Sequence, residues 1–145
     1  VVSSAGKHRK KYVLVYLIQE DVNVLDAAGK YAKEHGYDII INKKSLEFIM
    51  NNSPDSFLAW IEHAEAVFTN SFHGTAFSII YQKLLAADIV LKDGGTNNRI
   101  KELLCSAGLK QCIITQSNKV PSLANADKWL QLQKNNAREF LMQNI

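Results

Sequence analysis

Short apolar runs alternate along this chain with longer segments of helical spacing. The first run, YVLVYLI at residues 12–18, has few polar breaks, which is typical of a strand buried on both faces in a parallel sheet. Shorter runs follow at intervals that leave room for a helix between them. The pattern predicts strands at residues 12–18, 37–41, 66–69 and 86–91, and a last short strand at 112–115.

Helix signals occupy the intervals between these runs. Apolar residues at helical spacing predict a helix over residues 21–35, and Gly36 ends it. Ser53-Pro54-Asp55 combines an N-cap serine, a proline at the first helical position and an acid in the first turn, so a helix starts there. Further helices are predicted over residues 71–83, 97–107 and about 123–143, with residues 42–52 predicted only as a connector.

The alternation of strand and helix, at least four times over, defines the expected fold class. Connections of this length favour right-handed crossovers, and hence a parallel sheet with helices on both faces. We therefore expect a three-layer, Rossmann-like α/β fold, with residues 1–145 as one domain and residues 1–11 as a flexible start. Since the chain does not begin with Met, we expect it to be a piece of a longer protein.

Composition excludes several classes of protein. A hydrophobic fraction of 47% is that of a soluble core and excludes intrinsic disorder. Seventeen basic against fourteen acidic residues give a net charge of +3 without a basic block, so nucleic acid is not expected as a partner. The longest apolar run has six residues, whereas a membrane span needs roughly 20. Cys105 and Cys112 form no disulfide framework and no metal motif, which indicates a reducing compartment.

Candidate chemistry lies where the predicted strands end, because open parallel sheets bind ligands beyond the carboxyl ends of their strands. Segments 19–21, 70–75 and 92–99 lie there. In the second segment Ser71 can cap a helix whose first N–H groups then face the crevice and attract an anion. His73 stands beside that anion as a donor of a proton or a hydrogen bond, and Gly74 would allow close approach of a ligand.

Each of these residues also has a structural interpretation. A single histidine near a helix start is more often a surface residue, and His8, His35 and His63 are predicted to face solvent. Arg99 lies near a helix start, where a cation opposes the dipole unless an anion sits between them. It is therefore either an anion contact or a solvated surface residue. Asp21 is either a base or a helix start, and we favour the helix start. There is no GxGxxG fingerprint and no P-loop, so a classical dinucleotide site is not expected.

Two stretches carry a family resemblance. The sequences SPDSFL at residues 53–58 and AEAVFTNSFHGTAFSII at residues 64–80 resemble the signature region of the polysaccharide pyruvyl transferase family. A second, weaker block resembles the family's next motif, namely Asn98-Arg99-Ile100, Leu103-Leu104 and Gly108-Leu109. The resemblance covers roughly residues 12–109.

The resemblance implies a fold of two Rossmann-like halves that face each other across a cleft, as in GT-B glycosyltransferases. This chain matches the C-terminal half, so the N-terminal domain of the same protein is an implied partner. The implied activity transfers a pyruvyl group from phosphoenolpyruvate to a sugar or glycolipid acceptor, as in the biosynthesis of bacterial exopolysaccharide, capsule or cell wall. No metal and no organic cofactor are implied, and the implied location is the cytoplasm or the inner face of the membrane.

The resemblance also assigns site residues. His73 lies at the family's histidine and is the expected acid/base or phosphate contact. Ser71 stands where better-understood branches often have Arg, so the charge that holds the donor must come from Arg99, Lys92 or the other half. The expected substrate-binding residues are Asn70, Ser71, Gly74, Thr75, Lys92 and Arg99.

Two alternatives remain open at this point. One is a GT-B-like glycosyltransferase that uses a nucleotide-sugar donor at the same sheet edge. The other is a module that binds a sugar or an anion without catalysis.

Overall fold

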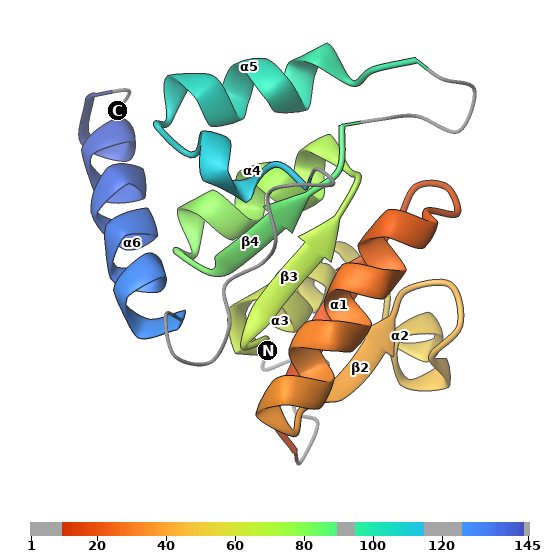
Figure 1. Cartoon of the computed structure of the whole chain (residues 1–145). Helices are drawn as coiled ribbons and strands as arrows, with labels where there is room; N and C mark the ends of the chain where they lie inside the picture. The colour runs from red at the N-terminus through yellow and green to blue at the C-terminus, as the bar shows by residue number, and fades with distance from the viewer. Residues whose placement is uncertain (1–9, 90–94, 115–125, 144–145) are drawn as a thin grey trace.

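A four-stranded parallel sheet with helices on both faces forms the body of the protein (Figure 1). The computed structural model describes residues 10–89, 95–114 and 126–143. The strands are β1 (Tyr12–Tyr16), β2 (Asp38–Ile41), β3 (Ala66–Thr69) and β4 (Leu84–Ala87), in the order β2-β1-β3-β4. The helices are α1 (Val22–His35), α2 (Leu46–Met50), α3 (Pro54–His63), α4 (Phe72–Ile80), α5 (Asn98–Ser106) and α6 (Ala126–Gln143), with a 3₁₀ turn, η1, at Lys110–Cys112.

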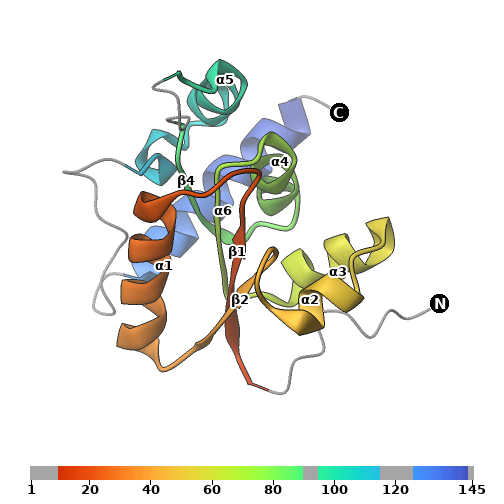
Figure 2. The same cartoon turned by 90° about the vertical axis from the view of Figure 1, so that its right-hand side faces the viewer.

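The two faces of the sheet bury separate sets of side chains. Val13 and Val15 of β1 pack under α1, whereas Leu14 points to the opposite face and packs with Trp60 of α3. Figure 2 shows α1 on one side of the sheet and α2, α3 and α4 on the other. The predicted three-layer α/β arrangement with a parallel sheet is therefore confirmed, and the double burial explains why β1 is apolar at successive positions.

The predicted helix boundaries correspond to observed caps. The Ser53 Oγ accepts a hydrogen bond from the Ser56 N–H at 3.3 Å, and the Asn97 Oδ1 accepts one from the Ile100 N–H at 3.3 Å. Gly36 follows α1 with a φ of 70°, a left-handed conformation in which glycine is favoured. The capping signals therefore located these helix ends correctly.

The region around β4 differs from the prediction. Helix α4 ends at Ile80 rather than at residue 83, and Gln82 adopts a left-handed φ of 54°. The chain then enters β4 at Leu84, two residues before the predicted start, and the strand ends at Ala87. Asp88 and Ile89 of the predicted strand over 86–91 lie beyond it, and residues 90–91 lie outside the described residues. Leu84 and Leu85 pair with β3 and are fully buried, so pairing with a neighbouring strand set the boundary. The apolar run continues past Ala87 to Ile89, interrupted only by Asp88, so it carries little local signal for the end of the strand.

Three smaller differences complete the comparison. The connector over residues 42–52 contains the short helix α2. Residues 112–115 form no strand in their described part, because η1 occupies the first of them and Ile113 makes only an isolated parallel bridge to Ala87. Helix α6 is described from Ala126, and residues 115 and 123–125 of the predicted elements lie outside the described residues.

Among the described helices, none combines the length and the hydropathy that crossing a bilayer requires.

Helix α6 covers the outer edge of β4. Its Gln133 side chain is only 1% exposed; its Oε1 accepts the Leu85 N–H at 3.3 Å, and its Nε2 donates to the Lys83 carbonyl. A side-chain amide thus replaces a neighbouring strand, which satisfies backbone groups that a sheet edge leaves open.

Candidate active site

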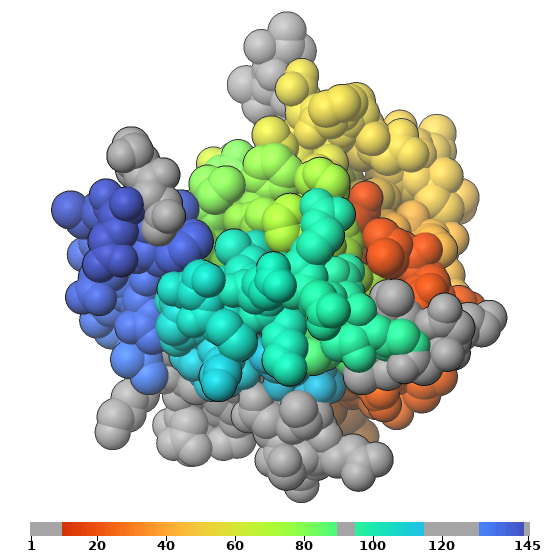
Figure 3. Space-filling model, turned by 90° about the horizontal axis from the view of Figure 1, so that it is seen from above, coloured from red at the N-terminus to blue at the C-terminus, as the bar shows by residue number. Residues whose placement is uncertain are grey.

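The carboxyl ends of β1 and β3 form the point at which the sheet topology reverses. Helix α1 leaves β1 on one face and leads to β2, whereas α4 leaves β3 on the opposite face and leads to β4. The β1–α1 turn and the β3–α4 turn therefore lead to opposite faces of the sheet. The crevice between two such turns is where open α/β sheets bind ligands. In Figure 3, the red β1–α1 turn, the green start of α4 and the teal α5 lie next to one another on the face seen from above.

Thr69, the last residue of β3, fixes how α4 leaves the sheet. Its hydroxyl donates to the Tyr16 carbonyl at 2.6 Å and accepts the Ser71 N–H at 2.9 Å. A Cβ added at Gly74 would lie 2.7 Å from the Thr69 Oγ1, so the first turn of α4 approaches the strand end more closely than any other residue type permits. The glycine is therefore required by packing against Thr69.

Asn70 joins the two turns at the topological reversal. Its side chain is fully buried; its Oδ1 accepts the Ile18 N–H at 2.9 Å, and its Nδ2 donates to the Gln19 carbonyl at 3.1 Å. Asn42, which follows β2, holds the other side of the β1–α1 turn through two hydrogen bonds of 2.9 Å with the backbone of Leu17. Two amide side chains thus hold a turn that has no regular structure.

The predicted cap of α4 is confirmed. The Ser71 Oγ accepts the Gly74 N–H at 3.2 Å, and the Thr75 hydroxyl donates to the Ser71 carbonyl at 2.8 Å. By the geometry of an α-helix, the N–H groups of Phe72 and His73 have no acceptor within α4. These two donors, together with the positive end of the helix dipole, favour an anion at this place.

An aromatic ring brings a cation to the same helix start. The Arg99 guanidinium carbon lies 4.1 Å from the centroid of the Phe72 ring, a cation–π contact between α5 and α4. The His73 ring meets the Phe72 ring nearly edge-on, at 5.9 Å between centroids and 83° between planes. His73 and Arg99 are both exposed. Phe72 was not among the predicted site residues, because nothing in a local pattern distinguishes a ring that packs on a distant arginine from an ordinary core residue.

The predicted site residues thus separate into two groups. His73 and Arg99 lie at the surface beside the start of α4. Four others are buried and take part in internal hydrogen bonds or close packing: Asn70, Ser71, Gly74 and Thr75. Lys92 lies outside the described residues.

Two carboxyl groups lie beneath this edge. Asp21 caps α1, with its Oδ1 accepting the Val24 N–H at 3.2 Å, which confirms the helix-start interpretation. Asp88 follows β4, and the two residues are 8% and 2% exposed. Burial, and after it the neighbouring Asp88 carboxyl, raise the pKa of Asp21 to about 6. Asp88 was also missed, although an acid inside the apolar run LLAADIVL is the signal that could have identified it.

The other histidines lie away from this edge. His63 is exposed on α3, as predicted, and His8 lies outside the described residues. The prediction for His35 is wrong, because its ring stacks on the Tyr31 ring at 4.0 Å between centroids and its Nδ1 is 2.9 Å from the Tyr31 carbonyl. An aromatic residue one helical turn earlier gives this histidine a packing partner.

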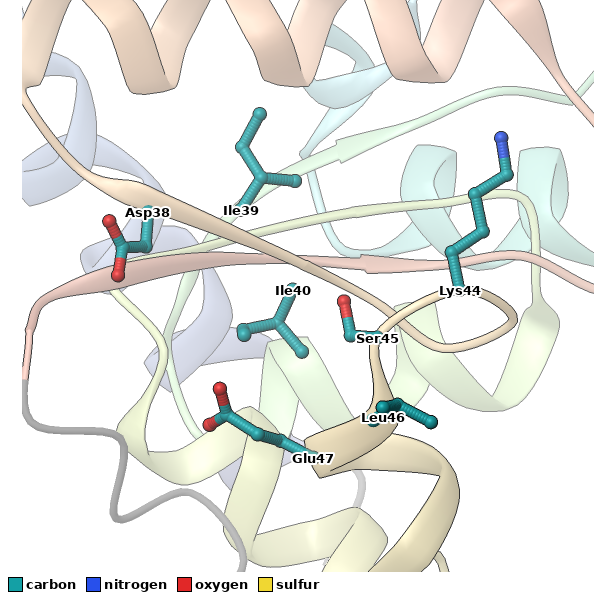
Figure 4. Close-up of a pocket in the computed structure, with 7 residues that line it drawn as sticks. All are labelled: Asp38, Ile39, Ile40, Lys44, Ser45, Leu46 and Glu47. Atoms are coloured by element: carbon teal, nitrogen blue, oxygen red, sulfur yellow. The ribbon is translucent and has the colours of Figure 1, made fainter.

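A hollow of about 550 Å³ lies along the outer strand β2 (Figure 4). It is lined by Asp38, Ile39, Ile40, Lys44, Ser45, Leu46 and Glu47. Since β1 separates β2 from β3, this hollow is distinct from the start of α4. None of the predicted site residues lines it, and it is not the candidate site.

Comparison with known proteins identifies the family. A model of the polysaccharide pyruvyl transferase family matches residues 4–83, more than half of the chain. The chain belongs to the polysaccharide pyruvyl transferase family. The matched region includes the segment from Thr69 to Thr75 with His73, and it ends before Arg99. A search of curated proteins and a search of solved structures found no match.

Family membership points to a transferase whose acceptor is a polysaccharide. Within the described part of the chain, no group of three or more His, Cys, Asp or Glu side chains is arranged to hold a metal ion. Cys105 and Cys112 are free thiols. Among the described residues, the exposed His73 and Arg99 lie beside the first N–H groups of α4.

Proposed function

We propose that this chain is the C-terminal half of a GT-B-like, two-domain enzyme that transfers a pyruvyl group from phosphoenolpyruvate to a sugar of a bacterial surface polysaccharide or its precursor. The observation that carries the proposal is that His73, Arg99 and the first two N–H groups of α4 lie together. The start of α4 with His73 is within residues 4–83, which the family model matches, and Arg99 is contributed by α5. This grouping combines an acid/base with an anion site at the sheet edge where ligands of such folds bind.

The proposed reaction requires both an acid/base and an anion site. Formation of a ketal from an enol phosphate places a proton on the methylene carbon, joins the adjacent carbon to two sugar oxygens and releases phosphate. Imidazole changes its charge near neutral pH, so His73 is suited to deliver the proton or to accept one from a sugar hydroxyl. Its exposure leaves the ring accessible to a donor and an acceptor held between two domains.

Arg99 supplies the positive charge that Ser71 does not. The guanidinium lies over Phe72, the residue between Ser71 and His73, so a cation from α5 lies next to the position where, by the family resemblance, better-understood branches often have Arg. The helix dipole adds about 0.3–1 kcal/mol to anion binding. Lys92 and residues of the N-terminal domain complete the charge around the donor, and the buried residues Asn70, Ser71, Gly74 and Thr75 support the site from below.

The decisive experiment measures pyruvyl transfer by the full-length protein with its N-terminal domain. We expect His73→Ala to lower the turnover rate by about 10²-fold or more, which is typical of a lost acid/base. His63→Ala is the matched control, because His63 is also exposed and lies on a different helix, α3. Full activity of the His73 variant would disprove the assigned role.

Binding measurements on the same full-length protein distinguish the pyruvyl transferase from a glycosyltransferase and from a non-catalytic binding module. Titration with phosphoenolpyruvate and with nucleotide sugars shows which donor binds, and Arg99→Leu should weaken binding of the true donor because it removes the cation. Binding of nucleotide sugars alone would favour a glycosyltransferase. Binding of a donor analogue without any turnover would favour a non-catalytic module.

A further inference from the structure

Phe72 contacts both exposed side chains of the candidate site. The centroid of its ring is 4.1 Å from the Arg99 guanidinium carbon and 5.9 Å from the centroid of the His73 ring. Phe72 is the first residue of α4 and is partly buried, whereas Arg99 and His73 are exposed. A partly buried ring thus lies against two side chains that solvent would otherwise surround.

The core between α4 and α5 holds this ring in place. Phe72 packs against a buried cluster to which α5 contributes Ile100 and Leu104. Both of these side chains are fully buried. A ring packed against such close-packed side chains has little room to change its rotamer. Its position relative to the two helices is therefore set by the core.

The charge of Arg99 is unfavourably placed within its own helix. Its backbone is fixed, since Asn97 caps α5 and the next residue, Ile100, is fully buried. A cation in the first turn opposes the helix dipole, and neither α4 nor α5 has an acid in its first turn. The dipoles therefore direct the guanidinium away from both helix starts. The negative face of the Phe72 ring opposes this and attracts it to the start of α4.

A guanidinium held on a ring is still able to bind an oxyanion. Arginine stacks the flat face of its guanidinium on an aromatic ring, and its N–H donors, which lie in the guanidinium plane, stay available for two-point binding of a carboxylate or a phosphate. A side chain that is already held in one place also loses less rotamer freedom when the ligand binds. The contact between Phe72 and Arg99 therefore favours binding of an anion.

We propose that Phe72 is a positioning residue, whose ring holds the Arg99 guanidinium at the start of α4 and so strengthens binding of the anionic donor. Phe72 acts through Arg99 and not on the reacting atoms. The step from the guanidinium to the donor rests on the proposed function, whereas the holding of Arg99 by the ring does not.

Proton NMR of the 145-residue chain tests the holding of Arg99. Protons above an aromatic ring resonate upfield of their ordinary position, so the δ-methylene protons of Arg99 should be shifted upfield in the native chain. Phe72→Tyr should keep this shift because it keeps the ring, and Phe72→Leu should abolish it. The matched control is Phe77→Leu, which removes a partly buried ring of α4 that packs in a different cluster and should keep the shift. Ordinary positions of these signals in the native chain would overturn the proposal.

Binding of phosphoenolpyruvate by the full-length protein tests the consequence. Phe72→Leu should weaken this binding by about two- to fivefold, as expected for the loss of an exposed cation–π contact. Phe72→Tyr should restore the native affinity. In an Arg99→Leu background, Phe72→Leu should have no further effect, because the ring then has no cation to hold. An equal loss in both backgrounds would show a merely structural role and would overturn the proposal.

The two measurements also separate this proposal from the proposed function. If the native protein binds phosphoenolpyruvate and Phe72→Leu binds it equally well, the positioning role is wrong and the proposed function stands. If the native protein binds no phosphoenolpyruvate while the ring still shifts the Arg99 signals, the proposed donor is wrong. The holding of Arg99 by Phe72 then stands, and its assigned consequence for the donor fails.

Discussion

The absence of a Cβ atom at Gly74 determines how closely the start of α4 approaches β3. In most helices a glycine is unfavourable, because it leaves more backbone freedom to be lost on folding. Here the missing Cβ makes room for the Thr69 Oγ1, which lies 2.7 Å from where that Cβ would be. Thr69 cannot move aside without breaking its 2.6 Å hydrogen bond to the Tyr16 carbonyl. The glycine of the family motif thus has a packing reason independent of any ligand.

We expect Gly74→Ala to destabilise the protein by about 1–3 kcal/mol, the usual cost of overpacking, in spite of the higher helix propensity of alanine. The matched control is Gly29→Ala in α1, where an added Cβ would meet nothing within 4 Å and should stabilise by about 0.5–1 kcal/mol. Chemical denaturation of both variants measures the difference. Equal free energies of unfolding for the two variants would contradict the packing argument.

At the scale of elements, the β1–α1 turn is fixed by its neighbours and not by its own hydrogen bonds. Asn42 binds the backbone N–H and carbonyl of Leu17, as a paired strand would. Asn70 does the same for Ile18 and Gln19 from the other side. A turn held in this way has little conformational freedom.

Asn42→Asp tests this arrangement with almost no change of shape. The aspartate keeps the acceptor for the Leu17 N–H but places a second oxygen against the Leu17 carbonyl, so we expect a loss of about 1–3 kcal/mol. Asn135→Asp on α6 is the control, because Asn135 is exposed and only accepts from Gln131. Urea unfolding of the two variants decides the matter, and a loss below about 0.5 kcal/mol at Asn42 would count against the turn being held by this amide.

At the scale of the whole molecule, α6 completes the sheet. It comes from the end of the described chain, yet its Gln133 binds backbone groups at Lys83 and Leu85 on the outer edge of β4. Ala137 packs from the same helix into the cluster that includes Leu85. Without this cover, β4 would present an open edge to other chains.

Gln133→Ala should therefore lower stability by about 1–3 kcal/mol, because it leaves a buried N–H and a carbonyl without partners. We also expect faster hydrogen exchange at the Leu85 amide. Gln131→Ala, an exposed position on the same helix, should have little effect. Unchanged exchange at Leu85 in the Gln133 variant would show that α6 does not protect this edge.

Local signals predicted much of the fold. The apolar runs located the strands, and the caps at Asp21, Ser53 and Ser71 located three helix starts, because a cap joins residues only three positions apart. The boundaries of β4 were wrong because they depend on pairing with β3. For the site, the sequence identified the start of α4 and His73, but it did not single out Phe72, whose partner Arg99 lies far along the chain.

The sequence by itself determined the α/β class, the starts of α1, α3, α4 and α5, and the family motif, since each depends on neighbours within a few residues. Only the tertiary structure decided that the motif residues Asn70, Ser71, Gly74 and Thr75 are buried while His73 is exposed. It also decided that Arg99 meets Phe72 and that Asp21 and Asp88 are both buried. The physical reason is that strand order fixes which loops share an edge, and strand order follows from packing of the whole chain.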